Sequence, residues 1–150
     1  MMFCEKYRVT ALKNQSKTNI SVPFNVPKGI NRLVIEYSYF PKELEDKEEA
    51  YRQIKENLIR DCGDDWTEYT DFEEFMPLKN LITLSLDSPV GYVGAAHRQA
   101  QKQSHEISAS FSSVGFDKTE IYEGQWILTL NLHAVVTDVC SCEFEVRGYE

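Results

Sequence analysis

Short runs in which apolar and polar residues alternate make up most of this chain, and they restrict it to a fold built from β-strands. In the run 81–86, Ile82, Leu84 and Leu86 share one face of an extended chain. Comparable runs, separated by turn signals, cover residues 6–12, 20–26, 32–40, 106–111, 125–133 and 139–146. This spacing predicts an all-β fold, an antiparallel, jelly-roll-like β-sandwich of about seven to eight strands. Pro23 places its run at a sheet edge, because proline donates no hydrogen bond to a neighbouring strand.

Residues 42–60 depart from this alternation and predict one amphipathic α-helix inserted between strands. Four apolar residues recur there at helical intervals among glutamates and lysines: Leu44, Tyr51, Ile54 and Leu58. Gly63 follows at a position that suits a helix C-cap. We expect the apolar stripe of this helix to cover a face of one sheet.

The length and net charge of the chain limit its class and its partners. A length of 150 residues suits a single domain spanning 1–150. The net charge of −8 argues against nucleic acid, whose phosphates require clustered Lys and Arg, and against docking on anionic lipid. Glu5 and Lys6 stand where a signal peptide needs an apolar core, and no run is long enough to span a membrane. We therefore expect a cytoplasmic protein whose four cysteines are reduced.

Several short motifs follow one another in a recognisable order between residues 22 and 146. They are Asp87-Ser88-Pro89-Val90-Gly91, Gly94–Arg98, Ile107-Ser108, Gly115-Phe116 and Gly124-Gln125-Trp126, preceded by Phe24–Gly29 and the run RLVIEYSY. Their order resembles the N-terminal β-sandwich accessory domain of CehA/McbA-type PHP-domain metallophosphoesterases. The resemblance implies a β-sandwich that works beside a metal-dependent phosphoesterase.

Two departures from that family limit what the resemblance implies. The turn GYVGAAHR lacks the tryptophan that the family has after its Asp-Pro element, and no His-x-His occurs in the sequence. In the family, the metal motif Asp-x-His-x-His belongs to the catalytic domain that follows the sandwich. The resemblance therefore implies an accessory domain acting with a separately encoded PHP-type enzyme, with no catalytic residue or cofactor of its own.

Two segments are candidates for binding a ligand. His97 and Arg98 close a Gly-rich loop, where their side chains suit an anionic group. Trp66 and Tyr69 lie in an acidic, aromatic segment, and exposed aromatic rings stack on sugars. The alternative for these aromatic residues is a loop that pins its rings onto the sheet.

Metal binding and acid–base catalysis are less favoured for the remaining polar residues. Cys140 and Cys142 fall on the apolar face of the last run, where free cysteines pack as small hydrophobic side chains and not as half of a zinc site. The three histidines lie in separate contexts, and we expect each in a solvent-exposed loop. The carboxylates of 61–74 leave a calcium site open as an alternative to a solvated acidic loop.

The sequence therefore predicts a non-catalytic accessory or interaction domain whose partner is a protein. The alternative is a carbohydrate- or small-ligand-binding module whose partner is a glycan. An unrecognised hydrolase is a third hypothesis, although neither a nucleophile–base pair nor a ligand triad is apparent.

Overall fold

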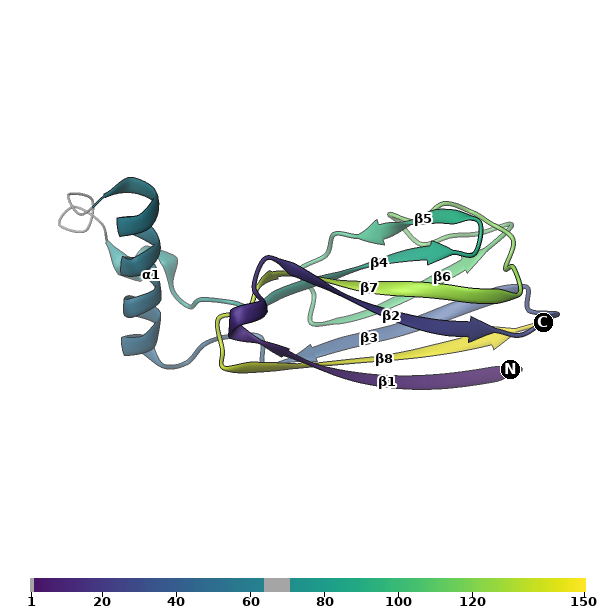
Figure 1. The fold of residues 1–150 in the computed structure, drawn as a ribbon, viewed down its shortest axis with the longest axis horizontal. Helices are drawn as coiled ribbons and strands as arrows, with labels where there is room; N and C mark the ends of the chain where they lie inside the picture. The colour runs from purple at the N-terminus through teal and green to yellow at the C-terminus, as the bar shows by residue number, and fades with distance from the viewer. Residues whose placement is uncertain (1, 64–70) are drawn as a thin grey trace.

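The computed structural model describes residues 2–63 and 71–150, which form two antiparallel sheets packed face to face (Figure 1). The strands are β1 Phe3–Leu12, β2 Thr18–Val26, β3 Arg32–Phe40, β4 Leu81–Ser88, β5 Gly91–Ala96, β6 Lys102–Ser108, β7 Gly124–Ala134 and β8 Val139–Tyr149. Sheet A has the order β1-β8-β3-β6, and sheet B has the order β2-β7-β4-β5. The predicted all-β sandwich is confirmed.

The strand order is that of a jelly roll. Strands β1 and β8, β2 and β7, β3 and β6, and β4 and β5 pair as if one long hairpin had been rolled into a sandwich. Strand β2 lies at an edge of sheet B, which confirms the prediction from Pro23. Among the described residues, no helix has the length and apolar character that crossing a membrane requires.

The core lies between the sheets and receives side chains from all eight strands. Alternate residues point inward, so that Leu33, Ile35, Leu84 and Leu130 are fully buried. Trp126 is also fully buried, and its indole N–H donates a 2.8 Å hydrogen bond to the carbonyl of Tyr122. Each fully buried leucine or isoleucine stabilises the fold by about 1.5–3 kcal/mol.

The inserted helix is present, but its start and its location differ from the prediction. Helix α1 spans Lys47–Cys62, and Asp46 caps it by accepting a hydrogen bond from the backbone N–H of Glu49. Residues 42–44 are excluded from the helix because they pair with the returning chain near Leu78. The helix lies beyond one end of the sandwich and does not cover a sheet face (Figure 1).

Two strands also differ from the sequence-based prediction. Residues Gly91–Ala96, expected to belong to a loop, form β5 in a hairpin with β4, with a bulge between Leu86 and Asp87. The glycines of this segment indicate a loop in the sequence. In the structure, Gly94 instead adopts a φ of +147° within a strand. The strand expected at 106–111 is β6, Lys102–Ser108. Its inward residues Gln103 and His105 are polar, which hides the alternation of a strand.

Candidate functional site

The feature that distinguishes this jelly roll is the chain between β3 and β4, residues 41–80, which we call the helical arm. It contains α1 and a short 3-10 helix, Phe72–Phe75, and it projects from one end of the sandwich (Figure 1). Ala50 and Ile54 are buried, yet the core cluster contains no described residue of the arm. The sandwich therefore completes its core without the arm.

The two ends of the arm are held together where they leave the sandwich. The backbone N–H of Leu44 donates to the carbonyl of Leu78 at 2.9 Å, and that of Asn80 donates to the carbonyl of Lys42 at 2.8 Å. The ammonium group of Lys42 donates to the hydroxyl of Tyr39 and to the carbonyls of Asn80 and Gln99, at 2.6, 3.0 and 2.7 Å. Burial lowers the pKa of Lys42, and its contacts identify it as a structural cross-link.

Asn80 fixes this base to the turn between β7 and β8. Its side chain is fully buried and donates to the carbonyl of Pro41 at 2.9 Å and to the hydroxyl of Thr137 at 2.8 Å. Its side-chain oxygen accepts a 2.7 Å hydrogen bond from the backbone N–H of Val136. Because every polar group of this buried amide has a partner, the base of the arm has a defined position.

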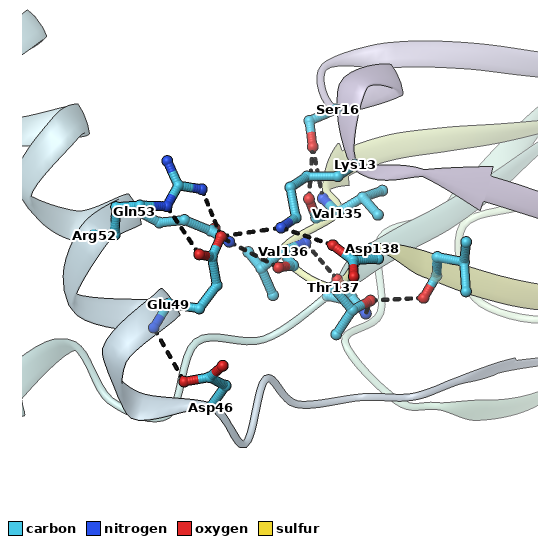
Figure 2. Close-up of polar contacts among 12 residues, drawn as sticks. Lys13, Ser16, Asp46, Glu49, Arg52, Gln53, Val135, Val136, Thr137 and Asp138 are labelled. Carbon is cyan, nitrogen blue, oxygen red and sulfur yellow. Dashed lines mark hydrogen bonds and ion pairs between the residues drawn. The ribbon is translucent and has the colours of Figure 1, made fainter.

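The helix itself is attached to the sandwich through polar side chains (Figure 2). The ammonium group of Lys13, which follows β1, lies 3.0 Å from a carboxylate oxygen of Glu49 and 3.1 Å from one of Asp138. Gln53 donates a 2.9 Å hydrogen bond to the carbonyl of Val136 and another of 2.9 Å to Glu49. Salt weakens ion pairs of this kind. The contact between the helix and the sandwich is therefore expected to weaken as the salt concentration rises.

The charged groups at the junction shift one another's pKa values. Hydrogen bonds from Arg52, Gln53 and Lys13 hold the pKa of Glu49 well below its usual range. The hydrogen bond to Glu49 is also the main cause that raises the pKa of Lys13. Both groups therefore stay ionised throughout the neutral pH range.

Replacing Lys13 by alanine is expected to loosen α1 while the sandwich stays folded. The variant loses the bridge between Glu49 and Asp138, so we expect amide hydrogen exchange in Lys47–Cys62 to become about threefold faster. Hydrogen-exchange mass spectrometry measures this directly. Lys28→Ala, in the turn after β2, is the control; equal exchange in α1 of both variants would show that Lys13 does not hold the helix.

The arm also carries nearly all of the net charge of the protein. Residues 41–80 contain 13 Asp and Glu against six Lys and Arg, a net charge of −7 out of −8 for the whole chain. The remaining 110 residues are therefore close to neutral. A projecting acidic element on a neutral scaffold directs long-range attraction to one end of the molecule.

A second surface feature is a shallow hollow of about 640 Å³ on the outer face of sheet A. Its rim carries charged side chains of both signs from all four strands, and these are largely paired with one another. Arg8 lies 2.5 Å from Glu143, and Lys6 lies 3.4 Å from Glu145. We interpret this hollow as a solvated face whose charges compensate one another within the sheet.

Of the four binding residues predicted from the sequence, the structure describes two. His97 and Arg98 are both exposed, directly after β5. Trp66 and Tyr69 lie outside the described residues, as does the part of the acidic segment 61–74 that spans 64–70. Cys140 and Cys142 are fully buried in the core cluster, which confirms their predicted packing role. Over residues 2–63 and 71–150, no three metal-ligating side chains come together.

The structure contradicts the prediction that each histidine lies in a solvent-exposed loop. His133 is exposed but lies within β7, and His105 lies within β6 and is 1% exposed. Its Nε2 is 2.9 Å from the side-chain oxygen of Gln103, whose amide nitrogen donates to the carbonyls of Arg98 and Ala100. Since that oxygen only accepts, Nε2 carries the proton, and the buried Nδ1 has no partner among the described residues.

The stability of the protein is expected to fall as the pH drops from about 7 to 5.5 because of His105. Burial is the main cause that lowers the pKa of His105, followed by the charge of Arg98, so the unfolded chain binds a proton in this range before the folded chain does. One such proton changes the free energy of unfolding by at most about 1.4 kcal/mol per pH unit. Urea unfolding of His105→Phe, compared with His97→Asn, measures the slope; an unchanged slope in His105→Phe would contradict this assignment.

Comparisons with known proteins assign no family. No protein-family model and no curated protein matches the chain. Among solved structures, the chain is similar to one described as GEBA250068378 from Sulfurospirillum deleyianum, with 9% sequence identity and a TM-score of 0.36, over 97% of this chain and 98% of that chain. A similarity this weak supports no statement about function. The proposal for function is therefore based on the geometry of the helical arm and of the two sheets.

Proposed function

We propose that this protein is a non-catalytic interaction module, a jelly-roll scaffold that presents its helical arm to a protein partner. The observation that carries the proposal is the position of the arm. It contributes no described residue to the core cluster, and it is nevertheless fixed to the sandwich by Asn80 and by the Lys13 junction. An element that adds nothing to the core and is still held in place is suited to contact another molecule.

The charge of the arm specifies the chemistry of the partner. A net charge of −7 over residues 41–80 favours a partner with a basic surface and repels nucleic acid and anionic lipid. Electrostatic attraction of this kind accelerates association and makes binding weaken with salt. The resemblance noted in the sequence supports a separately encoded PHP-type metallophosphoesterase as one such partner.

The proposal is tested by capture of partners from native cells with a tagged protein and a charge-neutralised arm. In the first variant the exposed carboxylates Glu45, Glu48 and Glu74 become glutamine. In the control, three exposed carboxylates from the end where β7 begins are neutralised instead: Asp117→Asn, Glu120→Gln and Glu123→Gln. Both variants change the net charge equally.

We expect the arm variant to retain at most about one tenth of the captured partner, and the control to retain all of it. The captured protein should also elute as the salt concentration rises. Equal capture by both variants would exclude the arm as the binding element. Mass spectrometry of the eluate identifies the partner and shows whether it is a PHP-type enzyme.

A further inference from the structure

The outer face of sheet B differs from the outer face of sheet A because it is almost free of charge. Its outward and accessible positions are Asn19, Ser21, Pro23 and Asn25 on β2, Gln125, Ile127, Thr129, Asn131 and His133 on β7, Ser85 and Asp87 on β4, and Tyr92 on β5. Thr83 and Ala95 lie on the same face but are buried. Asp87 is the only carboxylate among the accessible positions, and Lys and Arg are absent from these positions. The outer face of sheet A, in contrast, alternates acids and bases.

This composition suits a ligand that is itself uncharged and rich in hydroxyl groups. Amides and hydroxyls both donate and accept hydrogen bonds, and they lose water at a far smaller cost than charged side chains do. One such pair is already in contact on this face, where the hydroxyls of Ser21 and Thr129 lie 3.1 Å apart. A net charge of −8 repels anionic ligands, but it has no effect on the approach of a neutral one.

One row across all four strands combines three side chains with apolar surface and the carboxylate of Asp87. Pro23 pairs with Ile127, Ile127 with Asp87, and Asp87 with Tyr92. Tyr92, at the end of this row, is 64% exposed, so its ring is accessible to a ligand. Neighbouring strands lie about 4.8 Å apart, so the row offers a contact at regular intervals along a ligand that lies across the strands.

We propose that the outer face of sheet B binds a neutral oligosaccharide, which lies across the strands with one sugar ring stacked on Tyr92. Sugar rings combine an apolar C–H face with hydroxyl groups at the edge, which matches the apolar surface of this row and the amides and hydroxyls on either side of it. A second copy of the chain fits this face less well, because the centres of homodimer interfaces are apolar and depleted of serine. The helical arm takes no part in this binding.

The test uses four neutral hexasaccharides, built from β-1,4-linked glucose, xylose or mannose, or from α-1,4-linked glucose, with the full-length protein in isothermal titration calorimetry. At least one is expected to bind. Tyr92→Ala should weaken that binding about tenfold or more. Tyr92→Phe should bind as the wild type does, because stacking needs the ring and not the hydroxyl. Gln125→Ala should weaken binding by a smaller factor, and Ser38→Ala, on the outer face of sheet A, should leave it unchanged.

The arm variant Glu45→Gln, Glu48→Gln, Glu74→Gln separates this inference from the proposed function, because it should bind the oligosaccharide as the wild type does. Thermal unfolding of each variant verifies that its fold is intact; Tyr92 is exposed, so its removal leaves the core unchanged. Absence of binding to all four hexasaccharides at concentrations up to about 5 mM would overturn the inference. Undiminished binding by Tyr92→Ala would overturn it as well.

Discussion

Replacing Gly94 by alanine is expected to lower the free energy of unfolding by about 3 kcal/mol or more. Gly94 lies in β5 with a φ of +147°, and an added Cβ would lie 2.2 Å from the carbonyl oxygen of Gly115 and 2.7 Å from the Cα of Phe116. Both are backbone atoms, and that carbonyl also accepts a 3.1 Å hydrogen bond from Ala95. The new methyl group therefore forces the two segments apart. Urea unfolding measures the loss.

Gly29→Ala provides a matched control for this prediction. Gly29 has a φ of +91°, and an added Cβ there would meet no atom within 4 Å. Its substitution should cost only the conformational penalty of a positive φ, about 1–2 kcal/mol. Equal losses in the two variants would show that the contact between β5 and Gly115 is not as close as described.

Replacing residues 43–79 by Asn-Gly is expected to leave a folded sandwich whose melting temperature changes by only about 5 °C. The backbone N–H of Asn80 already lies 2.8 Å from the carbonyl of Lys42, so a two-residue hairpin turn can join them. The core cluster loses no described side chain, because the arm contributes none. Circular dichroism and differential scanning calorimetry measure the retained β-structure and the cooperativity of unfolding.

The loss of stability in Trp126→Ala is the reference with which the effect of this deletion is compared. Trp126 is fully buried between the sheets, so its truncation should cost about 3–5 kcal/mol although it removes far fewer atoms than the deletion does. If the arm-deleted chain is instead less stable than Trp126→Ala, or unfolds without cooperativity, then the arm is part of the folding unit. In that case the attachment of the arm to the sandwich would be explained by stability alone.

The sheet architecture is largely predictable from local patterns in the sequence. Strands such as β3 and β7 alternate strictly, because one face of each packs against the opposite sheet. β5 was not predictable in this way, since Gly94 is required there by the close approach of Gly115 and not by a turn. β6 is displaced from its predicted range because its inward residues Gln103 and His105 are polar; Nε2 of His105 donates to the side-chain oxygen of Gln103.

The position of the helical arm depends on contacts that no local pattern contains. The spacing of Tyr51, Ile54 and Leu58 indicates a helix with an apolar stripe, but it does not specify what the stripe contacts. The junction combines Lys13 with Glu49 and Asp138, which are widely separated in the sequence. The same holds for the outer face of sheet B, whose lack of charge becomes visible only when four strands are aligned in register.

Site-specific photo-cross-linking in native cells tests most directly whether the helical arm is the surface that contacts a protein partner. A photoreactive residue is placed at Lys55, which is exposed on α1, and in a second protein at Lys118, which is exposed near the start of β7. We expect a discrete adduct from position 55 that is lost when Glu45, Glu48 and Glu74 are replaced by glutamine. An adduct from position 118 with none from position 55 would contradict the proposed function.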